Sequence, residues 1–82
     1  MAHAEEEDES GGRLTAPLPG QVTQVVAEAG ATVVRGQVLV VLEAMKTVFR
    51  LGAPADGVVE RVACRVGEMV QEGQLLVSFA DA

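Results

Sequence analysis

Short valine-rich runs separated by glycines dominate the pattern of hydrophobic and polar positions along this chain. Short valine-rich runs that also contain polar residues lie near residues 21–28 and 37–42, and such runs are typical of strands. Glycine recurs every six to ten residues, too often for the interior of a helix. The pattern therefore predicts strands near 21–28 and 37–42 and a very short strand at Val33. Turns are expected at the three glycines Gly20, Gly30 and Gly36.

The same pattern occurs a second time further along the chain. Residues 16–42 align with residues 53–79 at an offset of 37 positions without gaps, and eleven aligned positions are identical. The second copy predicts strands near 58–65 and 74–79, with a short strand at Val70. Its turns are expected at Gly57, Gly67 and Gly73.

Two copies of this length are each too short to bury a core alone, so we expect them to pack face to face. The predicted fold class is all-β, a small flattened β-barrel or sandwich of two pseudo-two-fold-related four-stranded halves. A solenoid is the alternative, but two units are fewer than a solenoid normally has. Leu39–Val40 and Leu76–Val77 occupy equivalent core positions, together with Val25 and Val62. Because side chains alternate along a strand, we expect only one residue of each Leu–Val pair to point fully inward.

The segment that joins the two copies, residues 43–52, is expected to form a hairpin with its tip near Met45 and Lys46. Lys46 is the only lysine of the chain, and the other five side chains counted as positively charged at pH 7 are arginines. A lysine in an unspecified hairpin is usually just solvated. Here, however, Met45 stands where a surface turn commonly has Asn or Asp. An exposed methionine beside the sole lysine indicates a recognition surface.

Composition and charge exclude some functions. The chain is 49% hydrophobic, but it has no Trp or Tyr and only two Phe, which leaves little to stack on nucleic acid bases. The net charge of −6 disfavours binding to phosphate backbones and to anionic membranes. Five acidic residues lie among the first twelve, so residues 1–12 are predicted to be a disordered acidic tail or linker.

Cysteine and hydropathy add further expectations. The single cysteine, Cys64, has no partner for an internal disulfide, and the sequence shows no metal-binding cluster. Cys64 aligns with Ala27, so a buried, inert thiol is predicted, and Met69 is expected to serve packing rather than recognition. With no secretion signal and no membrane-length apolar run, a cytoplasmic location is expected, or the mitochondrial matrix if the protein is eukaryotic.

The tetrapeptide Glu43-Ala44-Met45-Lys46 resembles the attachment motif of the biotinyl domain family, in which a lysine between two methionines on a β-hairpin is biotinylated. The glycine and Ala-Pro positions follow that family's layout from about residue 14 to the end. The similarity is to the biotin carboxyl carrier domains of acyl-CoA carboxylase alpha subunits, such as methylcrotonyl-CoA carboxylase. Thr47 stands where the family usually has its second methionine.

This resemblance implies that residues 13–82 form a non-catalytic carrier domain, with no catalytic or metal-binding residues. Lys46 would be biotinylated by a biotin protein ligase, which activates biotin as an adenylate. The flanking residues Glu43, Ala44, Met45 and Thr47 would serve recognition. The covalent biotin would shuttle a carboxyl group from biotin carboxylase to carboxyltransferase for acyl-CoA carboxylation. The isolated domain is expected to be monomeric and to bind neither nucleic acid nor membrane.

Two other functions remain open at this point. A lipoyl domain shares the fold, the repeat and the hairpin lysine, although its lysine usually follows Asp and precedes Ala. An unmodified structural or interaction module of the same fold would generally lack a lysine at the tip.

Overall fold

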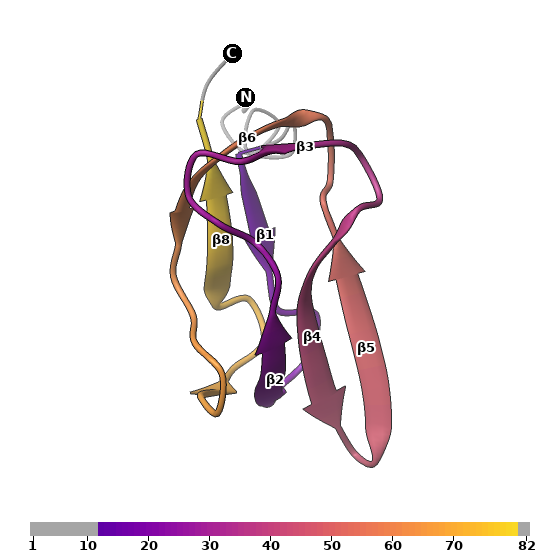
Figure 1. Ribbon diagram of the computed structural model, residues 1–82. Coiled ribbons are helices and arrows are strands. Elements are labelled where there is room, and N and C mark those ends of the chain that lie inside the picture. Colours follow the sequence, from indigo (N-terminus) through magenta and orange to yellow (C-terminus); the bar gives the residue numbers. More distant parts are fainter. Residues whose placement is uncertain (1–11, 81–82) are drawn as a thin grey trace, which may run out of the picture.

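The computed structural model describes residues 12–80, which form eight β-strands (Figure 1). The tail predicted over residues 1–12 lies outside the described residues, apart from Gly12. The carbonyl oxygen of Gly12 accepts a hydrogen bond of 3.0 Å from the backbone N–H of Phe79. The strands are β1 (Arg13–Thr15), β2 (Gly20–Val25), β3 (Thr32–Val33), β4 (Val38–Ala44), β5 (Thr47–Gly52), β6 (Gly57–Val62), β7 (Met69–Val70) and β8 (Leu75–Phe79).

The strands form two four-stranded antiparallel sheets, in the orders β1-β8-β6-β3 and β5-β4-β2-β7. The repeat offset converts one sheet into the other, since β8 aligns with β4, β6 with β2, and β3 with β7. β1 aligns with the second half of β5, where Arg13–Leu14 matches Arg50–Leu51. The predicted all-β fold of two pseudo-two-fold-related four-stranded halves is confirmed.

The two copies of the repeat exchange their short strands. β3 belongs to the first copy but pairs with β6, and β7 belongs to the second copy but pairs with β2. The two segments in which the chain crosses from one sheet to the other are held by hydrogen bonds from the N–H groups of two glycines with positive φ. Gly30 donates to the carbonyl of Val59, and Gly67 donates to the carbonyl of Val22, each at 2.7 Å. Each copy therefore completes the sheet of the other, and neither copy by itself supplies a complete four-stranded sheet.

Because the chain crosses between the sheets, two strands end earlier than the sequence predicted. β2 and β6 end three residues before the expected positions 28 and 65. The backbone N–H groups of Val26 and Ala27 both donate to the carbonyl of Leu39. After this point the chain leaves the sheet and crosses to the other one.

The core shows where the expected alternation was wrong. Leu39, Val40, Leu76 and Val77 are all buried, whereas Val25 and Val62 are only partly buried. In the β4–β5 ladder Val38 pairs with Gly52 and Val40 pairs with Leu51, which leaves Leu39 as the extra residue of a β-bulge. The β1–β8 ladder leaves out Leu76 in the same way. A bulge interrupts alternation, so both members of each Leu–Val pair face the core.

The hairpin of β4 and β5 is the feature that breaks the two-fold symmetry. β4 and β5 are longer than their equivalents β8 and β1. In Figure 1 the hairpin projects at the bottom, while β1 begins and β8 ends at the top. The pseudo-two-fold relates the hairpin tip to the region where β1 begins and β8 ends. The tip and these two strand ends therefore lie at opposite ends of the domain.

Candidate functional site at the hairpin tip

Met45 and Lys46 form the two-residue turn between β4 and β5, as predicted. Ala44 pairs with Thr47, and the two residues between them have φ angles of 51° and 67°. Positive φ at both central positions is the mark of a type I′ turn, which matches the twist of the flanking strands. Side chains other than glycine and asparagine are uncommon in this region, so the turn holds Met45 and Lys46 under backbone strain.

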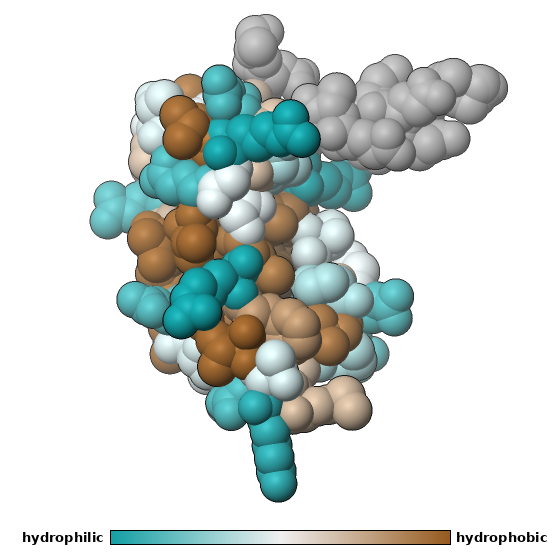
Figure 2. All heavy atoms as spheres, turned by 90° about the vertical axis from the view of Figure 1, so that its right-hand side faces the viewer, coloured by the Kyte–Doolittle hydropathy of each residue, from teal (hydrophilic) through white to brown (hydrophobic). Residues whose placement is uncertain are grey.

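The turn presents both of its side chains to solvent. Met45 is 88% exposed, and Lys46 is exposed as well. The face of the molecule in Figure 2 has a hydrophilic side chain extending from its lower end, where Figure 1 places the tip. Of the flanking residues, Glu43 and Thr47 are exposed but Ala44 is only 6% exposed. Ala44 therefore anchors the base of the tip and offers little surface of its own.

Gly20 on β2 supports the hairpin base. A Cβ at this position would lie 2.6 Å from the carbonyl oxygen of Glu43 and 3.1 Å from the Cβ of Ala44. Real side chains do not tolerate the shorter approach, so only glycine lets β2 lie this close to β4. The close contact holds the strand that leads directly into the turn.

Two residues that the sequence analysis did not assign to the site lie beside the tip. Gln21 and Met69 line a shallow hollow together with Glu43, Met45 and Lys46. The prediction that Met69 serves packing was wrong, because its side chain is 68% exposed. The sequence did contain a signal. Val70 aligns with the core residue Val33, so alternation along the strand turns Met69 outward.

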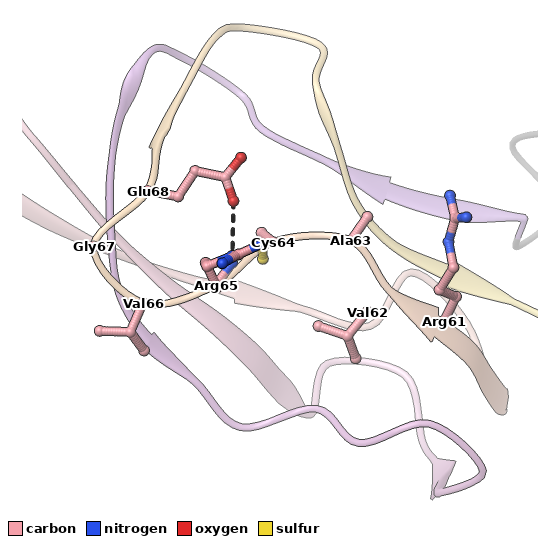
Figure 3. A pocket seen from close by; sticks show the side chains of 8 residues that line it. All are labelled: Arg61, Val62, Ala63, Cys64, Arg65, Val66, Gly67 and Glu68. Atoms are coloured by element: carbon pink, nitrogen blue, oxygen red, sulfur yellow. Dashed lines mark hydrogen bonds between the residues drawn. The ribbon is translucent and has the colours of Figure 1, made fainter.

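A second hollow lies along the loop that follows β6 and is lined by residues 61–68 (Figure 3). It contains Cys64, which is buried as predicted. The backbone N–H of Arg65 donates to Oε1 of Glu68 at 3.1 Å, the dashed line in Figure 3. Burial raises the pKa of the Cys64 thiol, and the negative charge of Glu68 raises it further. The reactive thiolate is therefore disfavoured.

Other site types find little support in the part of the chain that the structure describes. Among residues 12–80, no three His, Cys, Asp or Glu side chains gather in a way that could hold a metal ion. That same part has no helix long and apolar enough to cross a membrane. The hairpin tip remains the candidate site with the clearest geometry.

Comparison with known proteins identifies the family of this chain. The profile of the Biotin_lipoyl family, described as biotin-requiring enzyme, matches residues 12–79. A segment of 35 residues is 57% identical to mitochondrial pyruvate carboxylase from Rattus norvegicus, covering 43% of this chain and 3% of that protein.

Solved structures of other proteins share the fold, among them the following three. A single-chain, multi-domain long-chain acyl-CoA carboxylase is 40% identical with a TM-score of 0.79, over 85% of this chain and 7% of that one. Urea carboxylase from Kluyveromyces lactis is 31% identical with a TM-score of 0.77, over 83% and 6% respectively. The lipoyl domain of the 2-oxoglutarate dehydrogenase complex from Azotobacter vinelandii is 30% identical with a TM-score of 0.67, over 77% and 80%.

This chain thus spans only a small part of the carboxylases and most of the lipoyl domain. The profile match covers nearly all of the described residues, and the strand order is that of two interlocked repeats with a lysine at the hairpin tip. The chain belongs to the Biotin_lipoyl family, and within it resembles the biotinyl carrier domains of carboxylases.

Proposed function

We propose that this chain is the biotin carboxyl carrier domain of a biotin-dependent carboxylase and that biotin is attached to Lys46. The observation that carries the proposal is the placement of the only lysine at an exposed, two-residue hairpin tip. The similarity to three carboxylases with different substrates supports it.

The position of Lys46 suits an acyl acceptor. Its amine is on a flexible four-carbon stem that leaves the body of the domain. In the proposed step, the neutral amine of Lys46 attacks the activated carboxyl carbon of biotin, and a C–N bond forms. The leaving group departs with its electron pair, and the nitrogen loses a proton. A free lysine amine is mostly protonated at neutral pH, so the biotin protein ligase must help to remove that proton.

The remaining residues would provide reach and orientation. Biotin, once bound, supplies a ureido nitrogen that can carry a carboxyl group. The tip lies at the opposite end of the domain from the start of β1 and the end of β8, as Figure 1 shows. A tether at that end would leave Lys46 free to enter two separate clefts, one in biotin carboxylase and one in carboxyltransferase. Residues 1–12 would act as part of that tether and raise the local concentration of the carrier.

We further propose an acyl-CoA as the carboxylated substrate of the whole assembly. The identity is 40% to the acyl-CoA carboxylase and 31% to the urea carboxylase, over similar shares of this chain, 85% and 83%. The carriers of such different enzymes share one fold, since the substrate is held by the carboxyltransferase and not by the carrier.

Lipoylation is the competing function, because a lipoyl domain shares the fold. Lipoyl domains usually have Asp before the lysine and Ala after it, and Met45 and Thr47 match neither. The structural similarity to the two carboxylases is also higher, with TM-scores of 0.79 and 0.77 against 0.67. Both observations favour biotin.

The test is the intact mass after co-expression with a biotin ligase and free biotin. We expect one biotinyl addition on the wild-type chain and none on Lys46→Arg, which keeps the positive charge and should keep the fold. Circular dichroism of both proteins checks that they are folded.

The absence of any addition on a folded chain with an active ligase would contradict the proposal. Repeating the experiment with a lipoate ligase would then distinguish a lipoyl domain from an unmodified module. An unfolded Lys46→Arg variant would contradict the exposed position of the tip.

A further inference from the structure

Four exposed side chains form one row across the outer face of the second sheet. Glu43 on β4 pairs with Val48 on β5 on one side and with Gln21 on β2 on the other. Gln21 in turn pairs with Met69 on β7. Directly paired residues point to the same face of a sheet. We call Val48, Glu43, Gln21 and Met69 the outer row. With strands about 4.8 Å apart, the outer row is about 14 Å long.

The outer row lies next to Lys46. Gln21, Glu43 and Met69 line a shallow hollow that Lys46 and Met45 also line. Both methionines are mostly exposed, at 88% for Met45 and 68% for Met69. Neither is needed by the core, so the structure leaves two flexible thioether side chains beside the modified position.

We propose that the outer row is a resting site for the bicyclic ring of the biotin carried by Lys46. This inference rests on the proposed function. The sulfur-containing ring and its aliphatic chain would lie against the thioethers of Met45 and Met69. The two N–H groups of the ureido ring need acceptors, and the exposed carboxylate of Glu43 is one. The ureido oxygen needs a donor, and the side-chain amide of Gln21 is one.

The side chain of Gln21 is available for this role. Its only hydrogen bond within the described residues runs from Nε2 to the carbonyl of Gly67 at a long 3.4 Å, and the group is exposed. One N–H of the amide and its oxygen are thus left for a ligand. The outer row has two polar groups in its middle and an apolar group at each end. A ring with one polar and one apolar side can therefore contact a polar group and an adjacent apolar group at the same time.

A weak site is sufficient because the ligand is tethered. A short flexible tether gives an effective concentration on the order of 1 mM. A site with a Kd of about 1 mM would then be roughly half occupied, while the arm stays free about half of the time. An open, shallow hollow fits this requirement, since a deep pocket would hinder delivery to the partner enzymes.

Methyl NMR of methionine tests the inference directly. The chain has three methionines, so labelling gives three signals, from Met1, Met45 and Met69. We expect biotinylation to shift Met45, which adjoins Lys46, and also Met69, which lies two strands away. Intact mass measured on the same sample reports whether biotin is attached, which tests the proposed function separately.

Two variants separate ring contact from other effects. Lys46→Gln removes the charge without adding a ring and should leave Met69 unshifted. Met69→Ala should reduce the biotin-induced shift of the Gln21 side-chain amide by roughly twofold or more. The matched control is Val34→Ala, which removes a similarly exposed side chain in the loop before β4 and should leave that shift unchanged.

The outcomes distinguish the two ideas. Full biotinylation with a shift at Met45 but none at Met69 or Gln21 would overturn the resting site and leave the proposed function standing. An equal shift of Met69 in Lys46→Gln would also overturn it, because charge removal would then explain the change. No biotin addition at all would contradict the proposed function itself.

Discussion

Gly20 and Glu43 approach each other more closely than any side chain at position 20 would allow. A Cβ on Gly20 would lie 2.6 Å from the carbonyl oxygen of Glu43. Gly57 occupies the equivalent position in the second copy, yet a Cβ there would meet no atom of residues 12–80 within 4 Å. The difference arises because β4 continues beyond the position at which β8 ends. The hairpin, and not the fold as such, therefore requires glycine at position 20.

Replacing these two glycines by alanine should give different results. Gly20→Ala forces β2 away from the hairpin base, and we expect a loss of about 1–3 kcal/mol in the free energy of unfolding. Gly57→Ala has room and should change it by less than about 0.5 kcal/mol. Urea denaturation followed by far-UV circular dichroism is the suitable measurement, because the chain has no Trp or Tyr. Equal urea denaturation midpoints for Gly20→Ala and Gly57→Ala would refute the requirement for glycine at position 20.

The two bulge leucines should be equally important for stability. Leu39 and Leu76 are 1% and 0% exposed, and truncation of either to alanine leaves a cavity in the shared core. We expect each variant to lose roughly 2–5 kcal/mol, a large share of the stability of so small a domain. The exposed Val34→Ala serves as the control. Unchanged denaturation midpoints in both leucine variants would show that the core is assigned wrongly.

The backbone strain in the turn predicts that stability and recognition by the ligase favour different residues at position 45. Met45 has a φ of 51°, a region that asparagine tolerates better than methionine. Met45→Asn should therefore raise the free energy of unfolding by about 0.5 kcal/mol. If the methionine is read by the ligase, the same change should slow biotinylation of Lys46 several-fold in a timed mass assay. An unaltered rate would mean that the ligase does not recognise Met45.

Cys64 should make stability depend on pH in the alkaline range. Burial, and secondarily the charge of Glu68, raise the pKa of this thiol in the folded state. A group with a raised folded pKa contributes its full stability below the unfolded value, which is about 8.5 for cysteine. That contribution is lost as the pH rises from there through the folded pKa, because the unfolded chain releases the proton first.

Denaturation midpoints at pH 7 and pH 10 measure this effect. Cys64→Ala is a conservative control, since the equivalent residue in the first copy is Ala27, and it should lose less stability between the two pH values. Glu68→Gln keeps an acceptor for the N–H of Arg65 but removes the charge. The stability that Glu68→Gln loses between pH 7 and pH 10 should therefore be smaller than the loss in the wild type and larger than the loss in Cys64→Ala. Identical pH dependence in all three proteins would contradict a raised pKa for Cys64.

Several features of the fold could be predicted from local sequence because they follow from local chemistry. The glycines between valine-rich runs correctly predicted the turns at Gly30, Gly36, Gly67 and Gly73, but the turns predicted at Gly20 and Gly57 were wrong, because both residues begin strands. The internal identity predicted the two-fold symmetry. The sole lysine in the linking segment identified Lys46 as the candidate site. The strand ends were predicted less well, since the chain leaves each sheet three residues early to cross to the other one.

The remaining features were decided by contacts between the two copies. Leu39 and Val40 both face inward because a β-bulge interrupts the alternation that local reasoning assumes. Met69 lies beside Gln21 because β7 of the second copy pairs with β2 of the first. A two-residue strand carries too little pattern to show which sheet it joins. The sequence alone therefore determined the fold class, the repeat and the lysine, and the tertiary structure decided which side chains surround that lysine, because they come from strands far apart in the chain.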